Sequence, residues 1–234
     1  MHNHLKKELI RLLSSYVTPR RLTKMQQVIS QRTRHLTIVL EDIYQSHNAS
    51  AVIRSCDCFG VQDVHIIENQ NKYTVNPDVA LGASKWLSLR KYGEKDFNTQ
   101  ECLHRLKKEG YQLIATTPHK DEFLLEELPA QQKTALLFGT EMQGLTPEAI
   151  SMADGFMKIP MVGFTESFNI SVSVAICLYH LTPKIRQEVT NWQLSDDEQL
   201  DVMLEWLMQS VKNADSLVKQ LYPLPADLTR QDKA

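Results

Sequence analysis

Six short, largely apolar segments between residues 36 and 161 constrain most strongly what this chain can fold into. Helix-compatible or turn-rich stretches separate most of them. The expected strands are 36–43, 63–68, 86–92, 111–117, 134–139 and 155–161, and the expected helices are 48–60, 97–110, 146–154 and 170–181. Alternating strands and helices of this kind favour a parallel sheet with helices on both faces. The sequence therefore predicts an α/β fold.

Local signals mark the ends of two of these helices. Asn48 has the residue type of an N-cap, and Gly60 is suited to stop the same helix. Thr146 is an N-cap candidate, and Pro147 after it is favoured at the first helical position. Both helices therefore have starts that the side chains themselves predict.

Helical extensions are expected at both ends of the α/β region. Residues 4–16 place leucines on one helical face, and after a break at Thr18-Pro19 a second basic stretch continues to about residue 31. A charged connection follows Thr182-Pro183, and a helical tail is expected over about 196–221. We predict a basic helical extension (1–35), a central domain (36–182) and an acidic helical extension (183–234).

The formal net charge of −2 conceals an uneven distribution. The first 34 residues contain eight Lys or Arg and one acidic residue, Glu8, whereas residues 188–234 contain four Lys or Arg and nine Asp or Glu. A basic arm on an acidic body favours a polyanionic partner such as RNA. A solvated helix face would have the same composition, so charge alone leaves both interpretations open.

Composition excludes several classes of protein. No apolar run approaches the roughly 20 residues of a membrane span, and the N-terminus lacks the pattern of a signal peptide. The four cysteines match neither a disulfide framework nor zinc-ligand spacing. We expect reduced, mostly buried thiols in a cytoplasmic protein without a metal site or a membrane association.

Three loops at expected strand ends contain polar or glycine-rich sequences. They are ATTPHK (115–120), LLFGTEMQGLTPE (136–148) and IPMVGFTESFNISVSVAI (159–176). Ligands of parallel sheets bind beyond the carboxyl ends of the strands, which places all three loops at a candidate site. Taken singly, each has a plain structural explanation: the glycines form turns, Ser167 and Asn169 cap a helix, and Glu141 is a solvated acid.

Together with NASAVIR (48–54), these loops resemble the SpoU/TrmH family of RNA ribose 2′-O-methyltransferases, in the SPOUT superfamily. The first family motif, Asn and Arg separated by five residues, is Asn48 to Arg54. The second, G-x-E-x-x-G, is GTEMQG, and the third is IPMVGFTESFNISVSVA, where Val174 precedes Ala175 at its end. The motifs occur in family order, and the resemblance extends from about residue 36 to 181.

The resemblance implies a fold and a cofactor. The family fold is a parallel α/β sheet whose C-terminal segment forms a deep trefoil knot, and the knot region binds S-adenosyl-L-methionine. By similarity, Thr116, Gly139, Ile159 and Phe168 should line that pocket. Glu141, Ser167 and Asn169 match the polar catalytic residues of the family. Phe168 stands where the family usually has leucine, which keeps the apolar contact and changes the shape of the pocket.

The resemblance also implies a homodimer in which Arg54 faces the cofactor of the partner subunit. Our hypothesis is that Arg54 binds the phosphate or ribose and stabilises the developing alkoxide, with Asn48 orienting it. A guanidinium keeps its proton above about pH 12, so a simple base role is disfavoured. The structural alternative is an ion pair between Arg54 and Asp57 three residues later on the same helix.

The short basic N-terminus most resembles the tRNA-modifying TrmH branch, which methylates guanosine 18 in the D-loop. His47 matches a histidine of that branch, whereas Gln45-Ser46 departs from its usual Lys-Pro. Because the C-terminal tail is acidic, we expect the N-terminal basic residues to carry phosphate binding: Arg20, Arg21, Lys24, Arg32 and Arg34. The alternatives are ribosomal RNA, another tRNA position, or a non-catalytic RNA-binding protein.

Overall fold

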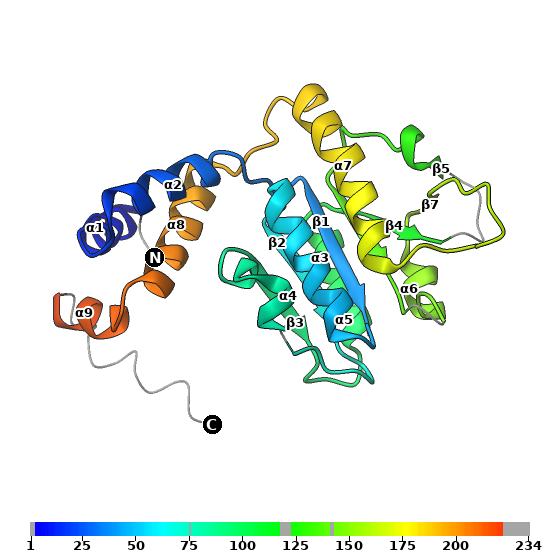
Figure 1. Cartoon of the computed structure of the whole chain (residues 1–234), viewed down its shortest axis with the longest axis horizontal. Helices are drawn as coiled ribbons and strands as arrows, with labels where there is room; N and C mark the ends of the chain where they lie inside the picture. Colours follow the sequence, from blue (N-terminus) through cyan, green and yellow to red (C-terminus); the bar gives the residue numbers. More distant parts are fainter. Residues whose placement is uncertain (1–2, 75, 118–122, 141–142, 222–234) are drawn as a thin grey trace. The chain divides into compact units, whose positions relative to one another are not determined.

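The computed structural model describes residues 3–74, 76–117, 123–140 and 143–221 (Figure 1). The chain divides into two compact units, which are described separately. The larger unit spans Arg32–Gln193, and the smaller unit combines Met1–Gln31 with Leu194–Ala234.

A seven-stranded parallel sheet forms the centre of the larger unit, with strand order β3-β2-β1-β6-β4-β7-β5. Its strands are β1 (Leu36–Glu41), β2 (Asp63–Ile67), β3 (Ser88–Tyr92), β4 (Gln112–Thr116), β5 (Phe123–Leu124), β6 (Thr134–Phe138) and β7 (Gly155–Lys158). All six predicted strands are confirmed. The seventh, β5, was not predicted, because two residues are too few to show an alternating pattern.

Helices cover both faces of the sheet, as the sequence predicts. They are α3 (Ser46–Phe59), α4 (Pro77–Ala80), α5 (Asn98–Lys108), α6 (Pro147–Met152) and α7 (Ile170–Glu188), with 3-10 turns at Ala83–Lys85 and Leu125–Glu127. On β1, Ile38 and Leu40 pack in the core that α3 and α7 cover, whereas Val39 packs in the core that α5 covers. This alternation follows from the two-residue period of a strand. Figure 1 shows α3 and α7 side by side on one face.

The predicted helix ends are confirmed at two places and wrong at a third. Gly60 ends α3 with a left-handed φ of 81°, and the Thr146 hydroxyl accepts a bond from the Ala149 amide (3.1 Å) at the start of α6. Asn48 is not the N-cap of α3, because the helix begins at Ser46 and Gln45 is its N-cap. Asn48 instead lies buried in the first turn.

The last helix of the larger unit is longer than expected. α7 continues through Thr182-Pro183 to Glu188. The Thr182 hydroxyl donates to the Leu178 carbonyl (2.8 Å), and Ile185 beyond the proline is buried. Burial of the apolar face on both sides of Pro183 therefore outweighs the cost of one missing helical hydrogen bond.

The smaller unit contains helices from both ends of the chain: α1 (Asn3–Ser14), α2 (Pro19–Ile29), α8 (Asp196–Ser210) and α9 (Ala214–Leu221). The single tail helix that was expected is thus two helices, separated where Asn213 has a φ of 57°. The acidic α8 pairs with the basic α1, since Lys6 forms an ion pair with Asp201 and Asn3 donates to Asp197 (2.5 Å). Acidic C-terminal residues therefore compensate part of the basic charge.

Two of the basic residues expected to contact RNA have internal partners instead. Arg32 is fully buried and forms an ion pair with Asp57, and its guanidinium also donates to the Val61 carbonyl (3.4 Å). Arg34 donates to the Asp63 carboxylate (2.9 Å) and is largely buried. Both guanidinium groups are therefore engaged by carboxylates within the chain. Among the described residues Asp57 forms its ion pair with Arg32 and not with Arg54, the structural alternative considered above.

The thiols are free, as the cysteine spacing predicts. Cys56, Cys102 and Cys177 are buried and Cys58 is exposed. Burial raises the pKa of the Cys177 thiol to about 12, which keeps it protonated and unreactive near neutral pH. Within the described ranges, no helix has the length and apolar character needed to cross a membrane.

Candidate active site

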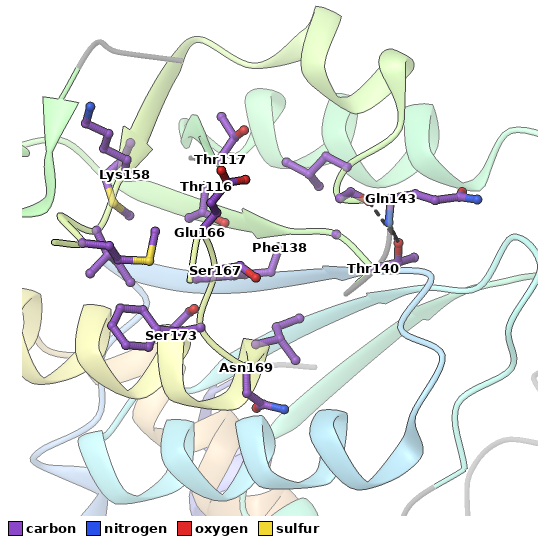
Figure 2. A pocket seen from close by; sticks show the side chains of 18 of the residues that line it. Thr116, Thr117, Phe138, Thr140, Gln143, Lys158, Glu166, Ser167, Asn169 and Ser173 are labelled. Carbon is purple, nitrogen blue, oxygen red and sulfur yellow. Dashed lines mark hydrogen bonds between the residues drawn. The ribbon is translucent and has the colours of Figure 1, made fainter. Parts of the chain in front are cut away.

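A cleft of about 680 Å³ opens at the carboxyl edge of the sheet, beyond β4, β6 and β7 (Figure 2). The described residues that line it are Thr116, Thr117, Phe138, Gly139, Thr140, Gln143, Gly144, Leu145, Ile150, Met157, Lys158, Ile159, Met161, Glu166, Ser167, Phe168, Asn169, Ile170 and Ser173. All of them except Ile150, Met157 and Lys158 come from the three loops that the sequence singles out. The parallel sheet therefore brings those loops to one place.

The structure gathers most of the predicted site residues in this cleft. All four residues expected to contact the cofactor line it: Thr116, Gly139, Ile159 and Phe168. Ser167 and Asn169 line it as well. Glu141 lies outside the described residues. Asn48 and Arg54 are not among the described residues that line the cleft.

Sequence reasoning missed several lining residues. Thr140, Gln143 and Leu145 belong to the second loop, and Ser173 lies one turn into α7. The first three could have been predicted from their position between Gly139 and Thr146, the N-cap of α6, in a loop that the sequence already singles out. Ser173 follows Asn169 by four residues, so helical spacing places it on the same side.

The second loop is closed by direct backbone contact, and we call its described residues, 139–140 and 143–146, the glycine loop. The Thr140 amide donates to the Gly144 carbonyl (2.9 Å), and the Gly144 amide donates to the Thr140 carbonyl (3.0 Å). The Thr140 hydroxyl also accepts a bond from the Gln143 amide (3.0 Å), drawn as a dashed line in Figure 2. A Cβ on Gly139 would lie 2.1 Å from the carbonyl carbon of Gly144. A glycine at position 139 therefore allows the backbone of Gly144 to approach closely, which a simple turn glycine would not have to do.

The third loop connects the cleft to α3. The Asn169 carboxamide oxygen accepts a bond from the Ser171 amide (2.9 Å), so Asn169 caps α7 as the plain structural interpretation expects. Its amide nitrogen also donates to the Asn48 side-chain oxygen (3.1 Å). The first and third sequence motifs are therefore joined by a hydrogen bond across 121 residues of sequence.

Arg54 is exposed on α3, outside the core that its neighbours occupy. Among the residues that the structure describes, no acidic side chain forms an ion pair with it. Arg54 is six positions after Asn48 on the helix, which places the two side chains about 9 Å apart along the axis and about 120° apart around it. In this chain Asn48 is hydrogen-bonded to Asn169.

Apolar side chains next to the cleft are unusually exposed. Val162 and Phe164 in the third loop are fully exposed, with relative exposures of 105% and 107%. Phe168, in the same loop, and Val172 and Tyr179, on α7, are further exposed apolar side chains. Large apolar side chains that stay exposed near one another are typical of interaction surfaces.

Comparisons with known proteins agree with these motifs. Residues 35–179 match the model of the SpoU rRNA Methylase family. A tRNA (guanosine(18)-2'-O)-methyltransferase of Borreliella burgdorferi is 44% identical over 204 residues, covering 87% of this chain and 92% of that protein. A protein with the same name from Thermus thermophilus is 33% identical, covering 69% of this chain and 81% of that protein. The structure of the A. aeolicus TrmH/SpoU tRNA modifying enzyme aligns with a TM-score of 0.73 at 28% identity. The alignment covers 82% of this chain and 98% of that one.

Replacing Gly139 with alanine should disrupt the cleft. The added methyl group would overlap the backbone of Gly144 and Leu145, so we expect a loss of about 3 kcal/mol in the free energy of unfolding. Urea titration followed by circular dichroism measures this loss. Gly163→Ala is the matched control, because the nearest heavy atom to its Cβ would be 3.9 Å away. Equal stability of the two variants would contradict the close approach described above.

Proposed function

Because this chain belongs to the SpoU rRNA methylase family, we propose that it transfers the methyl group of S-adenosylmethionine to a ribose 2′-hydroxyl of tRNA, at guanosine 18 in the D-loop. The convergence of the three motif loops on one cleft carries the proposal. The choice of nucleotide is supported by the Borreliella burgdorferi relative, which matches nearly the whole chain and is named for that position.

The residues of the cleft fit the proposed cofactor. A volume of about 680 Å³ lies within the range of small-molecule sites. Aliphatic and aromatic side chains, among them Leu145, Ile159 and Phe168, offer apolar surface for an adenine ring. Gly139 and Gly144 lack side chains, so the backbone of the glycine loop is accessible to the polar edges of a nucleoside. Thr116 and Ser167 add hydroxyl groups for the ribose or the amino acid part.

The proposal includes the trefoil knot of the family. Two observations support it. β7 follows β6 in sequence but lies between β4 and β5 in the sheet. The chain then passes along the cleft before α7 returns to pack against α3. A chain end that runs between earlier strands and back across the sheet is what a knot at this edge requires.

We further propose that the active site is completed by a second copy of this chain. The described lining of the cleft contains no arginine, whereas Arg54 is exposed and has no acidic partner within the described residues. The apolar surface formed by Val162, Phe164 and Tyr179 gives a reason for two copies to associate near the cleft. In such a homodimer, Arg54 of one subunit faces the cleft of the other.

In the proposed reaction, S-adenosylmethionine supplies an electrophilic methyl group on a sulfonium. The difficult partner is the ribose hydroxyl, a weak nucleophile until its proton is shared or removed. Arg54 holds the adjacent phosphate or ribose and stabilises negative charge that develops on the 2′-oxygen. Asn169, fixed by Asn48 and by its cap of α7, positions the third loop so that Ser167 faces the cleft. Glu141 is proposed to contribute to the same site by its place in the family motif.

RNA binding is assigned to basic residues that remain exposed. Arg20, Arg21 and Lys24 are exposed on α2, and Arg21 donates to the Ser210 hydroxyl (3.3 Å) without losing its exposure. His47 is exposed in the first turn of α3, next to the Asn48–Asn169 bond. Arg32 and Arg34 are left out of this surface because both pair with buried or largely buried carboxylates.

Methyl transfer to unmodified tRNA transcripts tests the proposed reaction. With labelled S-adenosylmethionine, nucleoside analysis should place the label in 2′-O-methylguanosine of the D-loop. Arg54→Ala should lower kcat by about 100-fold, as for loss of a group that stabilises the reacting oxygen. Arg54→Lys should not restore turnover, because lysine lacks the planar fork of donors.

Arg105→Ala is the matched control, since Arg105 is an exposed arginine on α5 that pairs with Glu109 (2.9 Å). It should behave as wild type. Label in ribosomal RNA but not in tRNA would overturn the proposed substrate. Absence of label in every RNA, together with absence of cofactor binding, would overturn the reaction itself.

Replacing Arg20, Arg21 and Lys24 with alanine should weaken tRNA binding and reduce its salt dependence. Each phosphate contact that is lost should lower the slope of log Kd against log salt by about 0.7–0.9. Fluorescence anisotropy at several salt concentrations measures both quantities. The control variant removes the same charge from the end of α5, at Arg105, Lys107 and Lys108. If both triple variants give the wild-type slope, α2 does not contact the RNA backbone.

A further inference from the structure

Glu41 is a buried carboxylate at the last position of β1 that neither the motifs nor the proposed reaction uses. It is 1% exposed, in a strand whose other residues are mostly aliphatic. One of its oxygens, Oε1, accepts bonds from the Thr99 hydroxyl (2.7 Å) and the Thr146 hydroxyl (2.8 Å). The other, Oε2, accepts a bond from the Thr146 amide (2.9 Å). No basic side chain within the described residues forms an ion pair with it.

The direction of each hydrogen bond is set by the partners of the two threonines. The Thr146 hydroxyl accepts from the Ala149 amide, so its single proton is directed to Glu41. The Thr99 hydroxyl accepts from the Asn69 side-chain amide (3.0 Å), so its proton also points to Glu41. Glu41 is therefore the final acceptor of both chains of bonds. A carboxyl group, with two oxygens that can each accept more than one bond, suits this position.

The place of Glu41 connects it to the glycine loop. In the register of β1 and β6, Leu40 pairs with Phe138, so Glu41 lies beside Gly139 at the start of the loop. Its bonds to Thr146 hold the other end of the loop, where α6 begins. Between these ends, the residues of the loop that the structure describes line the cleft: Gly139, Thr140, Gln143, Gly144 and Leu145.

An acidic side chain is a costly choice at this position unless its bonds are needed. Burying a carboxylate without a counter-ion is unfavourable, and only strong hydrogen bonds offset the cost. An aliphatic residue would pack in the strand without that cost, as Val39 does on the same face of β1. Anchoring the glycine loop gives a reason for the carboxylate.

We propose that Glu41 is a positioning residue, which holds the glycine loop in the conformation that forms one wall of the cofactor cleft. The anchoring itself follows from the contacts in the chain. Its effect on cofactor affinity rests on the proposed function. The residue acts through Thr146 and does not line the cleft.

The test is Glu41→Gln, read by amide hydrogen exchange and by cofactor affinity. Glutamine has one acceptor oxygen and an NH₂ group, which would face a donor at Thr146 or Thr99. Peptides that cover the glycine loop should exchange faster in the cofactor-free protein. The Kd for S-adenosylmethionine, measured by calorimetry, should rise about tenfold, as for loss of a hydrogen bond to a charged acceptor. The KM for tRNA should not change.

Variants of the two threonines separate positioning from general destabilisation. Thr99→Val removes one donor to the same carboxylate on the α5 side, so it should lower Tm and leave both loop exchange and cofactor affinity unchanged. Thr146→Val should reproduce the effect of Glu41→Gln, and Thr146→Ser should retain wild-type affinity. The double variant Glu41→Gln/Thr146→Val should bind the cofactor no more weakly than either single variant, because both remove one coupled contact.

Two results would overturn the inference. In one, Glu41→Gln lowers Tm to the same extent as Thr99→Val but leaves exchange of the glycine loop and cofactor affinity unchanged. In the other, the double variant raises the Kd for S-adenosylmethionine by the product of the factors found for Glu41→Gln and Thr146→Val alone. If the wild-type protein bound no cofactor while Glu41→Gln still accelerated loop exchange, the proposed function would fail and the anchoring of the loop would stand.

Discussion

All strands of the sheet run in the same direction, and the rest of the site depends on this constraint. Parallel strands end at one edge, so loops that are far apart in sequence meet there. Thr116 is the last residue of one strand, Gly139 follows a second and Ile159 follows a third, yet all three line one cleft. The direction of the strands therefore decides which loops meet at the site.

Two contacts then hold these loops in place around the cleft. Gly139 packs directly on the backbone of Gly144, which no residue with a side chain could do. Asn169 joins the third loop to Asn48 in α3. Because a motif on α3 and a motif before α7 share a hydrogen bond, the first motif contributes to the site through its asparagine even though Arg54 lies elsewhere.

The sequence was sufficient to predict elements with strong local signals. Strands such as 36–41 have a branched apolar run, and Gly60 and Thr146 have the residue types that helix ends require. Features that depend on partners distant in sequence were not predictable in the same way. The sequence gives no sign that Arg32 is buried, because its partner Asp57 lies 25 residues away. Likewise, α7 continues beyond Pro183 because residues after the proline are buried. The lining of the cleft was predicted well because whole loops, rather than single residues, were identified.

Subunit complementation tests whether one active site is divided between two chains, as we propose. One chain would carry Arg54→Ala with an intact cleft. The other would carry Ile159→Asp, which places a charge in the cleft, with Arg54 intact. Differently tagged copies allow the mixed dimer to be purified and its methyl transfer measured. If Arg54 serves the partner's cleft, both homodimers are inactive and the mixed dimer regains about half of the wild-type turnover, from its one complete site. If the mixed dimer is as inactive as the two homodimers, Arg54 does not act across the interface and the shared site is wrong.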